Sequence, residues 1–157
     1  MTKDRWLKLF IALGLPNAVG MVASLATMPA VRSWYADLAK PNYTPPNWIF
    51  APAWLVLYTM MGFAFFRIWN RSEDRRAVFA CWFYIVHLVF NGLWPLLFFG
   101  LHSPFWALID IILLCLMIIV MFFLFFAVDR KAAYLLIPYW LWVAFAASRN
   151  YLIWSMN

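Results

Sequence analysis

Charged residues are scarce in this chain of 157 residues, and their scarcity excludes most soluble folds. Only 11% of the residues are Asp, Glu, Lys or Arg, whereas a soluble domain usually carries about 25%. The polar side chains are too few to cover a surface that faces water. Hydrophobic residues make up 68% of the sequence, and 22% of the residues are aromatic. The composition therefore predicts a single membrane domain over residues 1–157.

Cysteines and catalytic motifs are sparse as well. Cys81 and Cys115 both lie within apolar runs, so we expect neither a disulfide framework nor a zinc cluster. The sequence contains no Ser-His-Asp set, no carboxylate pair suited to hydrolysis and no glycine-rich phosphate loop. His87 could ligate haem iron, but a second ligand at similar depth is missing, and no metal site is predicted. The net charge of +6 is spread over short clusters, which argues against nucleic-acid binding.

Five apolar segments are long enough to cross a bilayer as helices, since a crossing needs about 20 residues. They run over Trp6–Met28, Trp48–Trp69, Ala77–Gly100, Pro104–Val128 and Ala132–Trp154. The segments are too continuously apolar for the strands of an outer-membrane barrel. The predicted fold class is an all-α membrane protein, a five-transmembrane-helix bundle with a short helix in the long first loop. On the first segment, Gly14 with Ala18 and Gly20 with Ser24 predict close helix packing, which could serve the bundle or a dimer.

Basic residues are concentrated on one side of the predicted membrane. The N-terminal segment, the second connection and the fourth connection carry eight Lys or Arg residues, and the other side carries two, Arg32 and Lys40. By the positive-inside rule, the N-terminus and the basic connections lie inside, while the first loop and the C-terminus lie outside. The uncharged run Leu9–Val31 is long enough to span the membrane, so we expect it to be a helix rather than a cleaved signal peptide.

The first loop, from about Pro29 to Asn47, is much longer than the other connections. Ser33 is a candidate N-cap for a short helix over residues 34–38. The following run, KPNYTPP over residues 40–46, restricts the backbone to extended and turn conformations. The loop could form a lid over a pocket. Alternatively, its aromatic residues could form an interfacial belt that needs no ligand.

Polar and aromatic residues gather in the half of the bundle beneath this loop. Asp110 and Arg149 lie inside neighbouring antiparallel spans, where a bare charge is costly, so we predict an ion pair between them. That pair could be a tie between helices or a charged wall of a pocket. Trp142, Ala146 and Arg149 share one helix face, and Trp54 could stack opposite Trp142 around a flat ligand. Ordinary packing of large aromatic side chains is the alternative.

Four segments carry a resemblance to a known family: WYADLAKPNYTPP (34–46), LYTMMG (57–62), FNGLW (90–94) and PYWLWVAFA (138–146). In this order and spacing they resemble the tryptophan-rich sensory protein/translocator protein (TspO) family, in a bacterial form. Tyr43 stands where that signature usually has Trp, and Arg149 stands where an apolar residue is usual. No Lys or Arg follows Tyr151, so the sterol-recognition pattern that ends some members is absent.

The resemblance implies a five-helix bundle, often a homodimer, in the bacterial cytoplasmic membrane. It implies that protoporphyrin IX, haem-type tetrapyrroles, or benzodiazepine-type and sterol-like lipophilic ligands bind under the first loop, with membrane lipid around the bundle and no obligatory cofactor. The Asn91 amide could contact such a ligand or bond between helices. The expected ligand-binding residues are Trp34, Tyr35, Pro45, Phe50, Trp54, Tyr58, Asn91, Trp94, Asp110, Trp142, Ala146 and Asn150.

A membrane receptor or sensor is the function that these features favour. One alternative is an enzyme that degrades protoporphyrin with light and oxygen, in which Trp54 and Trp142 would be the catalytic residues. The other alternative is a transporter of tetrapyrroles or lipids. The sequence shows no internal repeat of the kind from which secondary transporters are built, which weighs against transport.

Overall fold

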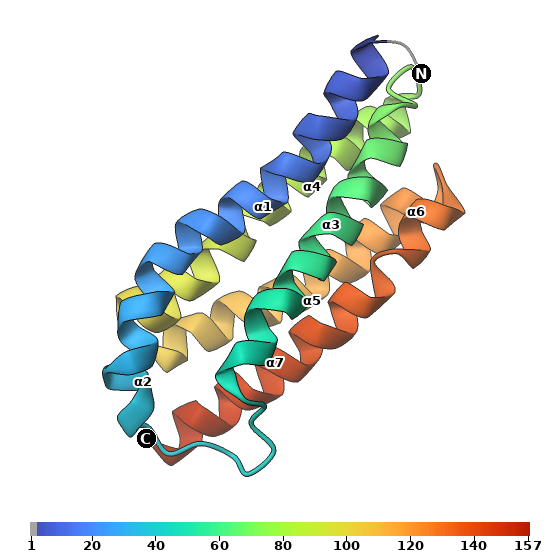
Figure 1. Ribbon diagram of the computed structural model, residues 1–157. Helices are drawn as coiled ribbons and strands as arrows, with labels where there is room; N and C mark the ends of the chain where they lie inside the picture. The colour runs from blue at the N-terminus through green and yellow to red at the C-terminus, as the bar shows by residue number, and fades with distance from the viewer. Residues whose placement is uncertain (1–2) are drawn as a thin grey trace.

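The computed structural model describes residues 3–157, which form helices and their connections. Five long helices lie side by side in this range (Figure 1), namely α1 (Lys3–Arg32), α3 (Phe50–Trp69), α4 (Arg75–Pro95), α5 (Pro104–Phe126) and α7 (Ile137–Met156). Shorter elements connect them: α2 (Trp34–Asp37), η1 (Asn47–Ile49), η2 (Leu96–Gly100) and α6 (Arg130–Tyr134). The prediction of an all-helical protein is confirmed.

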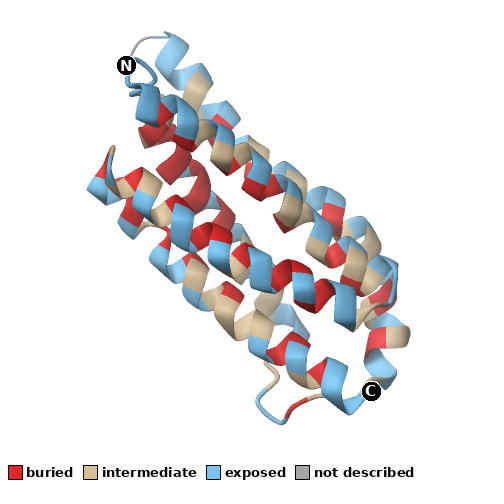
Figure 2. Ribbon diagram, turned by 180° about the vertical axis from the view of Figure 1, so that it is seen from behind, coloured by how far each residue is buried: buried red, intermediate tan, exposed pale blue. Residues whose placement is uncertain are grey.

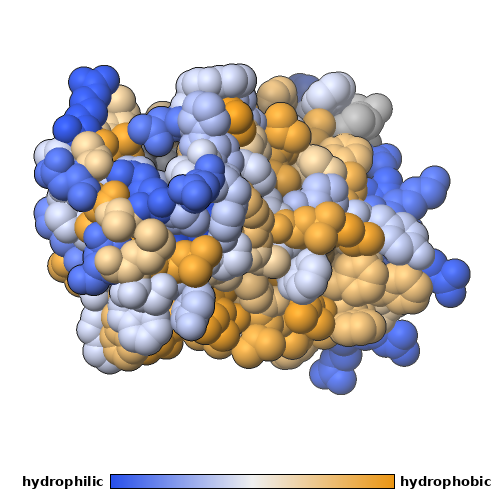
Figure 3. Space-filling model, turned by 90° about the horizontal axis from the view of Figure 1, so that it is seen from below, coloured by the Kyte–Doolittle hydropathy of each residue, from blue (hydrophilic) through white to orange (hydrophobic). Residues whose placement is uncertain are grey.

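Four helical stretches are long and apolar enough to cross a membrane: Lys3–Arg32, Asn47–Trp69, Arg75–Gly100 and Pro104–Phe126. They correspond to the first four predicted spans. Many large apolar side chains point outward, and Leu25, for example, is 74% exposed. Figure 3 shows hydrophobic side chains across the middle of one face, with the most hydrophilic side chains toward its two ends. Such an apolar outer surface is suited to contact with lipid.

The predicted fifth segment, Ala132–Trp154, is not one helix. Helix α6 ends at Tyr134 and α7 begins at Ile137, with a turn between them. Pro138 causes this break, because it has no backbone N–H to donate and it fits best in the first turn of a helix. The Asp129 carboxylate begins α6 by accepting hydrogen bonds from the backbone N–H groups of Lys131 and Ala132.

Pro95 changes the helix geometry in a similar way. Helix α4 ends at Pro95, and the π-helical turn η2 continues the same rod. In η2 the N–H of Leu101 donates to the carbonyl of Leu96 at 2.8 Å, five residues earlier. Proline cannot donate to the carbonyl four residues before it, and a local π turn is one way to accommodate the loss. The third predicted span is therefore continuous, but its last turn is wider.

Glycine sets the closest approach between helices. Helix α1 packs against α3 and α4, while α5 packs against α4 and α7, and buried residues lie along their inner faces (Figure 2). A Cβ atom at Gly62 of α3 would lie 2.5 Å from the Ala12 carbonyl oxygen of α1. Gly20 lies against the Tyr58 ring, as its predicted packing role requires. A Cβ atom at Gly14 would meet nothing within 4 Å among the described residues, so Gly14 does not serve packing inside the bundle, and the alternative of a dimer contact there stays a prediction.

An ion cluster ties α3 to the connection between α5 and α6, at the end of the bundle opposite the first loop. Asp129, 7% exposed, accepts a 2.7 Å hydrogen bond from Arg67 Nη2. Arg71 Nη2 lies 3.3 Å from the same carboxylate oxygen, and Arg71 Nη1 donates to the Val128 carbonyl at 2.6 Å. This cluster was not predicted, although an Asp directly before a basic helix start is a recognisable N-cap.

The contact at Gly62 predicts that Gly62→Ala destabilises the bundle. The added methyl group meets the backbone of α1, which cannot move aside as a flexible side chain can. We expect a loss of about 1–3 kcal/mol, typical of overpacking, measured by thermal unfolding in detergent. Gly14→Ala is the matched control, since it meets open space and gains helix propensity. Equal melting temperatures for the two variants would contradict this packing.

The second prediction concerns the pH dependence of the Asp129 cluster. Burial raises the pKa of Asp129, but hydrogen bonds from Arg67 and from the Ala132 and Lys131 N–H groups outweigh it and hold the pKa below 3.8. A carboxyl whose pKa is lowered by folding stabilises the protein above its unfolded pKa. That contribution is lost as the pH falls through the folded pKa.

We therefore expect Asp129→Asn to lower the unfolding free energy at neutral pH by about 1–3 kcal/mol. The melting temperature should fall accordingly. Asn still caps helices well, so the loss reports the charge. The difference from wild type should begin to shrink near pH 4, where the carboxyl of the unfolded chain becomes protonated, and should be lost as the pH falls through the lower pKa of the folded protein. A difference that stays constant from pH 7 to pH 3 would show that the charge is not responsible.

Candidate functional site

The first loop covers one end of the bundle. It comprises residues 33–46 because α1 continues to Arg32. Ser33 does not cap α2, since its hydroxyl donates to the Pro29 carbonyl at 3.0 Å. Within α2, the buried Tyr35 accepts a 2.7 Å hydrogen bond at its hydroxyl from Arg149 Nη2 of α7. The loop is thus joined to the bundle through a buried side chain, which supports its interpretation as an ordered cover.

Asn157 forms a second attachment of the first loop. Its Oδ1 accepts a hydrogen bond from the Ala39 N–H at 2.9 Å, and its Nδ2 donates to the Ala39 carbonyl at 3.1 Å. Both backbone groups of one loop residue are therefore satisfied by one side chain beyond α7. A third attachment is the stacking of Trp34 on His102, with 4.5 Å between ring centroids. We call the Asn157–Ala39 contact the clasp.

Aromatic side chains line the region between α3 and α7 beneath the loop. Trp54 and Trp142 are both half-buried. The Trp54 ring lies 5.1 Å from Tyr58 and 6.4 Å from Tyr139, and the Trp142 ring lies 5.9 Å from Phe50. The predicted stacking of Trp54 and Trp142 on opposite sides of a flat ligand stays a prediction. Their partial exposure leaves ring surface for a flat ligand.

Below these rings, a chain of buried hydrogen bonds joins α3, α4 and α7. Tyr58 donates its hydroxyl to Asn91 Oδ1 at 2.9 Å, and Asn91 Nδ2 donates to the Tyr139 hydroxyl at 2.8 Å. The Asn91 nitrogen can only donate, so the Tyr139 hydroxyl accepts this bond. The same hydroxyl lies 3.0 Å from His87 Nε2, and the tautomer of His87 decides which of these two atoms donates. We call these four residues the polar chain.

Trp94 and Asn150 form a separate tie nearer the loop. Trp94 Nε1 donates to Asn150 Oδ1 at 3.0 Å, and Asn150 Nδ2 donates to the Pro104 carbonyl at 2.7 Å. The amide of Asn150 therefore joins α4 to the start of α5. Asn150 is 1% exposed, and each end of its amide is used in one hydrogen bond within the bundle.

The predicted ion pair between Asp110 and Arg149 is wrong. Arg149 donates to Tyr35 instead, and its guanidinium carbon lies 4.8 Å above the Phe50 ring. Asp110 is buried, and within the described residues neither carboxylate oxygen has a hydrogen-bond partner. The helix register explains the error. The contact between Asn150 and Pro104 sets Arg149 near the start of α5, whereas Asp110 lies six residues, about 9 Å, further along that helix.

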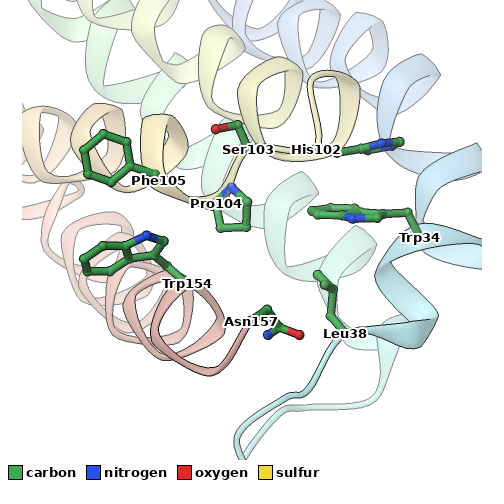
Figure 4. A pocket seen from close by; sticks show the side chains of 8 residues that line it. All are labelled: Trp34, Leu38, His102, Ser103, Pro104, Phe105, Trp154 and Asn157. Carbon is green, nitrogen blue, oxygen red and sulfur yellow. The ribbon is translucent and has the colours of Figure 1, made fainter.

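One cavity of about 330 Å³ opens beside the loop. Its lining residues come from α2, the start of α5 and the end of α7, namely Trp34, Leu38, His102, Ser103, Pro104, Phe105, Trp154 and Asn157 (Figure 4). Of the predicted ligand-binding residues, only Trp34 lines it. This cavity lies against the clasp rather than between Trp54 and Trp142. We interpret it as a space left where the first loop packs on the bundle, and not as the predicted ligand site.

The predicted ligand-binding residues therefore fall into three groups. Trp34 and Tyr35 attach the loop, while Tyr58, Asn91, Trp94 and Asn150 are occupied by hydrogen bonds within the bundle. Phe50, Trp54, Trp142 and Ala146 remain half-buried beneath the loop, as does Pro45 within it. Asp110 belongs to none of these groups, because it is buried on α5 and has no hydrogen-bond partner among the described residues. Sequence reasoning missed the role of Tyr139, for which its position one turn before Trp142 was the available signal.

Comparison with known proteins gives concordant matches over nearly the whole chain. The sequence pattern that describes the TspO/MBR family matches residues 12–155. The tryptophan-rich protein TspO of Archaeoglobus fulgidus is 39% identical over 153 residues, which are 96% of this chain and 97% of that protein. The translocator protein of Sus scrofa is 37% identical over 145 residues, covering 91% and 86% of the two chains. The tryptophan-rich sensory protein of Cereibacter sphaeroides is 31% identical over 140 residues, covering 89% and 87%.

The polar chain predicts different costs for two buried tyrosines. Tyr139→Phe leaves Asn91 Nδ2 and His87 Nε2 without a partner, and we expect it to lower the unfolding free energy by about 1–3 kcal/mol. Tyr84 is equally buried, but its hydroxyl has no hydrogen-bond partner among the described residues. Tyr84→Phe should therefore match or exceed the wild-type stability.

Thermal unfolding of both variants in the same detergent measures this difference. The two substitutions remove the same atom from the same type of side chain, so they differ only in hydrogen bonding. If Tyr139→Phe melts at the temperature of Tyr84→Phe, the polar chain does not hold the helices together.

Proposed function

The chain belongs to the TspO/MBR family, and from this membership we propose that it is a membrane receptor or sensor for flat lipophilic ligands. The ligand class that suits the site best is a porphyrin such as protoporphyrin IX. It would lie beneath the first loop, between α3 and α7. The observation that carries this proposal is the half-buried aromatic set of Phe50, Trp54 and Trp142 on α3 and α7, at the end of the bundle where the first loop is attached.

Several side chains supply what a porphyrin would require. The indoles of Trp54 and Trp142 offer faces for offset stacking on a conjugated macrocycle. Ala146 lies one turn after Trp142 on the same helix face, where its small side chain leaves room. Arg149 lies at the loop side of this face, and its guanidinium is suited to a propionate carboxylate. The site thus combines an apolar interior with a cation near its opening.

We further propose that α7 is a fifth crossing, in addition to the four apolar stretches. Its 20 residues extend for about 30 Å, the thickness of the hydrocarbon core. Five crossings place the first loop and the end of α7 on one side, and the basic connections on the other. The charge distribution then orients the basic side toward the cytoplasm, so the ligand enters from the outer side.

The tryptophan-rich, sensory and translocator names of the relatives accord with a receptor rather than with a conventional enzyme. Photochemical degradation of a bound porphyrin and its transport both presuppose the same binding step. Binding in the dark is therefore the first property to establish for this protein.

Protoporphyrin IX titration in the dark, followed by tryptophan fluorescence, tests the proposal. We expect saturable quenching by the wild-type protein in detergent micelles. Trp54→Leu and Trp142→Leu should each weaken binding about 2- to 12-fold, since an aromatic contact contributes about 0.5–1.5 kcal/mol. The dissociation constant is read from porphyrin absorbance as well, because each variant also lacks one fluorophore.

Trp106→Leu is the matched control. Trp106 lies on α5 and is 57% exposed on the outer surface of the bundle, so its loss should leave the dissociation constant unchanged. Wild-type affinity in both the Trp54 and Trp142 variants would place the ligand elsewhere. Quenching that never saturates would show partition into the detergent and contradict a receptor role.

A further inference from the structure

A groove lies between the start of α4 and the end of α5, at the end of the bundle opposite the first loop. Its volume is about 570 Å³, and its lining residues are Arg75, Arg76, Phe79, Val120, Phe123, Leu124 and Ala127. Apart from the two arginines, all of these side chains are apolar. The groove therefore has a basic mouth and a hydrophobic interior.

Arg75 and Arg76 are available to bind an anion. Both are exposed, and within the described part of the chain neither forms an ion pair. The nearby carboxylates are already engaged or lie outside the groove lining. Asp129 is paired with other arginines, and Asp74 accepts the Arg76 N–H at 2.8 Å as the N-cap of α4. Glu73 is exposed on the preceding connection.

The apolar part of the groove extends into the predicted depth of the membrane. Val120 and Ala127 are seven residues apart on α5, which is about 10 Å along the helix axis. One leaflet contributes about 15 Å of hydrocarbon, half of a typical core. Phe79 and Phe123 hold their rings outward, with 60% and 65% of their surface exposed. A hydrocarbon chain that entered at the arginines would meet apolar side chains over about two-thirds of the leaflet.

We propose that this groove binds one anionic phospholipid from the leaflet at the basic end of the bundle. The headgroup phosphate lies between the guanidinium groups of Arg75 and Arg76, which bind phosphate oxygens in bidentate fashion. One acyl chain lies along Phe79 and Phe123 toward Val120. The site is separate from the proposed porphyrin site, so neither proposal depends on the other.

Other occupants suit the groove less well. A soluble phosphate would satisfy the arginines but would leave the apolar walls uncovered. A second copy of the chain, docked by a two-fold axis through this groove, would bring four arginines together. A phospholipid satisfies both halves of the groove with one molecule, and basic clusters beside membrane helices commonly recognise anionic lipids.

Native mass spectrometry of the purified full chain can count bound lipids. Dioleoyl phosphatidylglycerol and dioleoyl phosphatidylcholine are the probes, because they differ in headgroup charge and share their acyl chains. We expect the wild type to prefer the anionic lipid. Loss of one direct guanidinium–phosphate contact should cost about fivefold in affinity, so Arg75→Gln with Arg76→Gln should reduce this preference by about 25-fold.

The matched control is Lys3→Gln with Arg5→Gln. These exposed residues carry the same charge at the same end of the bundle, but they do not line the groove. Their replacement should leave the preference within about twofold of wild type. An equal loss of preference in both double variants would show diffuse attraction by net charge and would overturn the specific site. An undiminished preference for the anionic lipid in the arginine variant would overturn the site as well.

Ala127→Trp tests the acyl-chain half of the groove without changing its charge. Ala127 is exposed, so the larger side chain can be accommodated while it fills the groove. Binding of both lipids should fall at least about fivefold. Unchanged binding would overturn the placement of the acyl chain. Competition by inorganic phosphate, at concentrations that displace the lipid from wild type, would show a soluble-anion site and overturn the assignment to phospholipid.

Discussion

Hydrocarbon offers no hydrogen-bond partner, so a polar side chain inside this bundle is stabilised by partners on neighbouring helices. The polar chain of Tyr58, Asn91, Tyr139 and His87 joins α3, α4 and α7 in this way, whereas Asp110 is buried without a hydrogen-bond partner among the described residues. The Asn91 amide fixes the directions of its own two hydrogen bonds, because its oxygen accepts and its nitrogen donates. The aromatic rings of the proposed ligand site rest on this chain, because Trp54 contacts both Tyr58 and Tyr139.

The two ends of the bundle use their polar residues differently. Beneath the first loop, the side chains of Arg149, Asn150 and Asn157 are engaged with backbone groups or with aromatic partners. At the opposite end, Asp129 binds Arg67 and Arg71, while Arg75 and Arg76 remain open at the mouth of a groove. One end is therefore closed by specific contacts. The other presents two exposed arginines that form no ion pair within the described part of the chain.

Hydropathy and segment length were sufficient to predict the four apolar stretches, because membrane helices are selected by those same properties. Pro138 indicates from the sequence that a backbone donor is missing in the fifth segment, but a proline either kinks a helix or ends it, and the sequence does not distinguish these outcomes. The Asp110–Arg149 pair failed for a different reason. Sequence spacing gives the face and depth of a residue on its own helix, whereas a pair also depends on the relative shift of two helices. The contact between Asn150 and Pro104 sets that shift.

The partners of Asn91 could not be predicted for the same reason, since two other helices had to be placed first. The family resemblance marked Asn91 as a site residue, and the structure shows that its amide is already bonded on both sides. Each end of this amide has one hydrogen-bonding position in use and one left. The resemblance thus pointed to Asn91 as a position of interest, while the hydrogen bonds show that its side chain connects α3, α4 and α7.

The clasp couples the movement of the first loop to the far end of α7. Asn157 also donates to the carbonyl of Ile153, so the residue that holds Ala39 is itself held by the final helical turn. The last turn of a helix is where fraying begins, because its carbonyls lack partners within the helix. Fraying of this turn would release both backbone groups of Ala39 at once, whereas the Arg149–Tyr35 hydrogen bond and the stacking of Trp34 on His102 would still hold α2 against the bundle. The part of the loop around Ala39 is thus attached through the final turn of α7, and the part around α2 is attached independently of it.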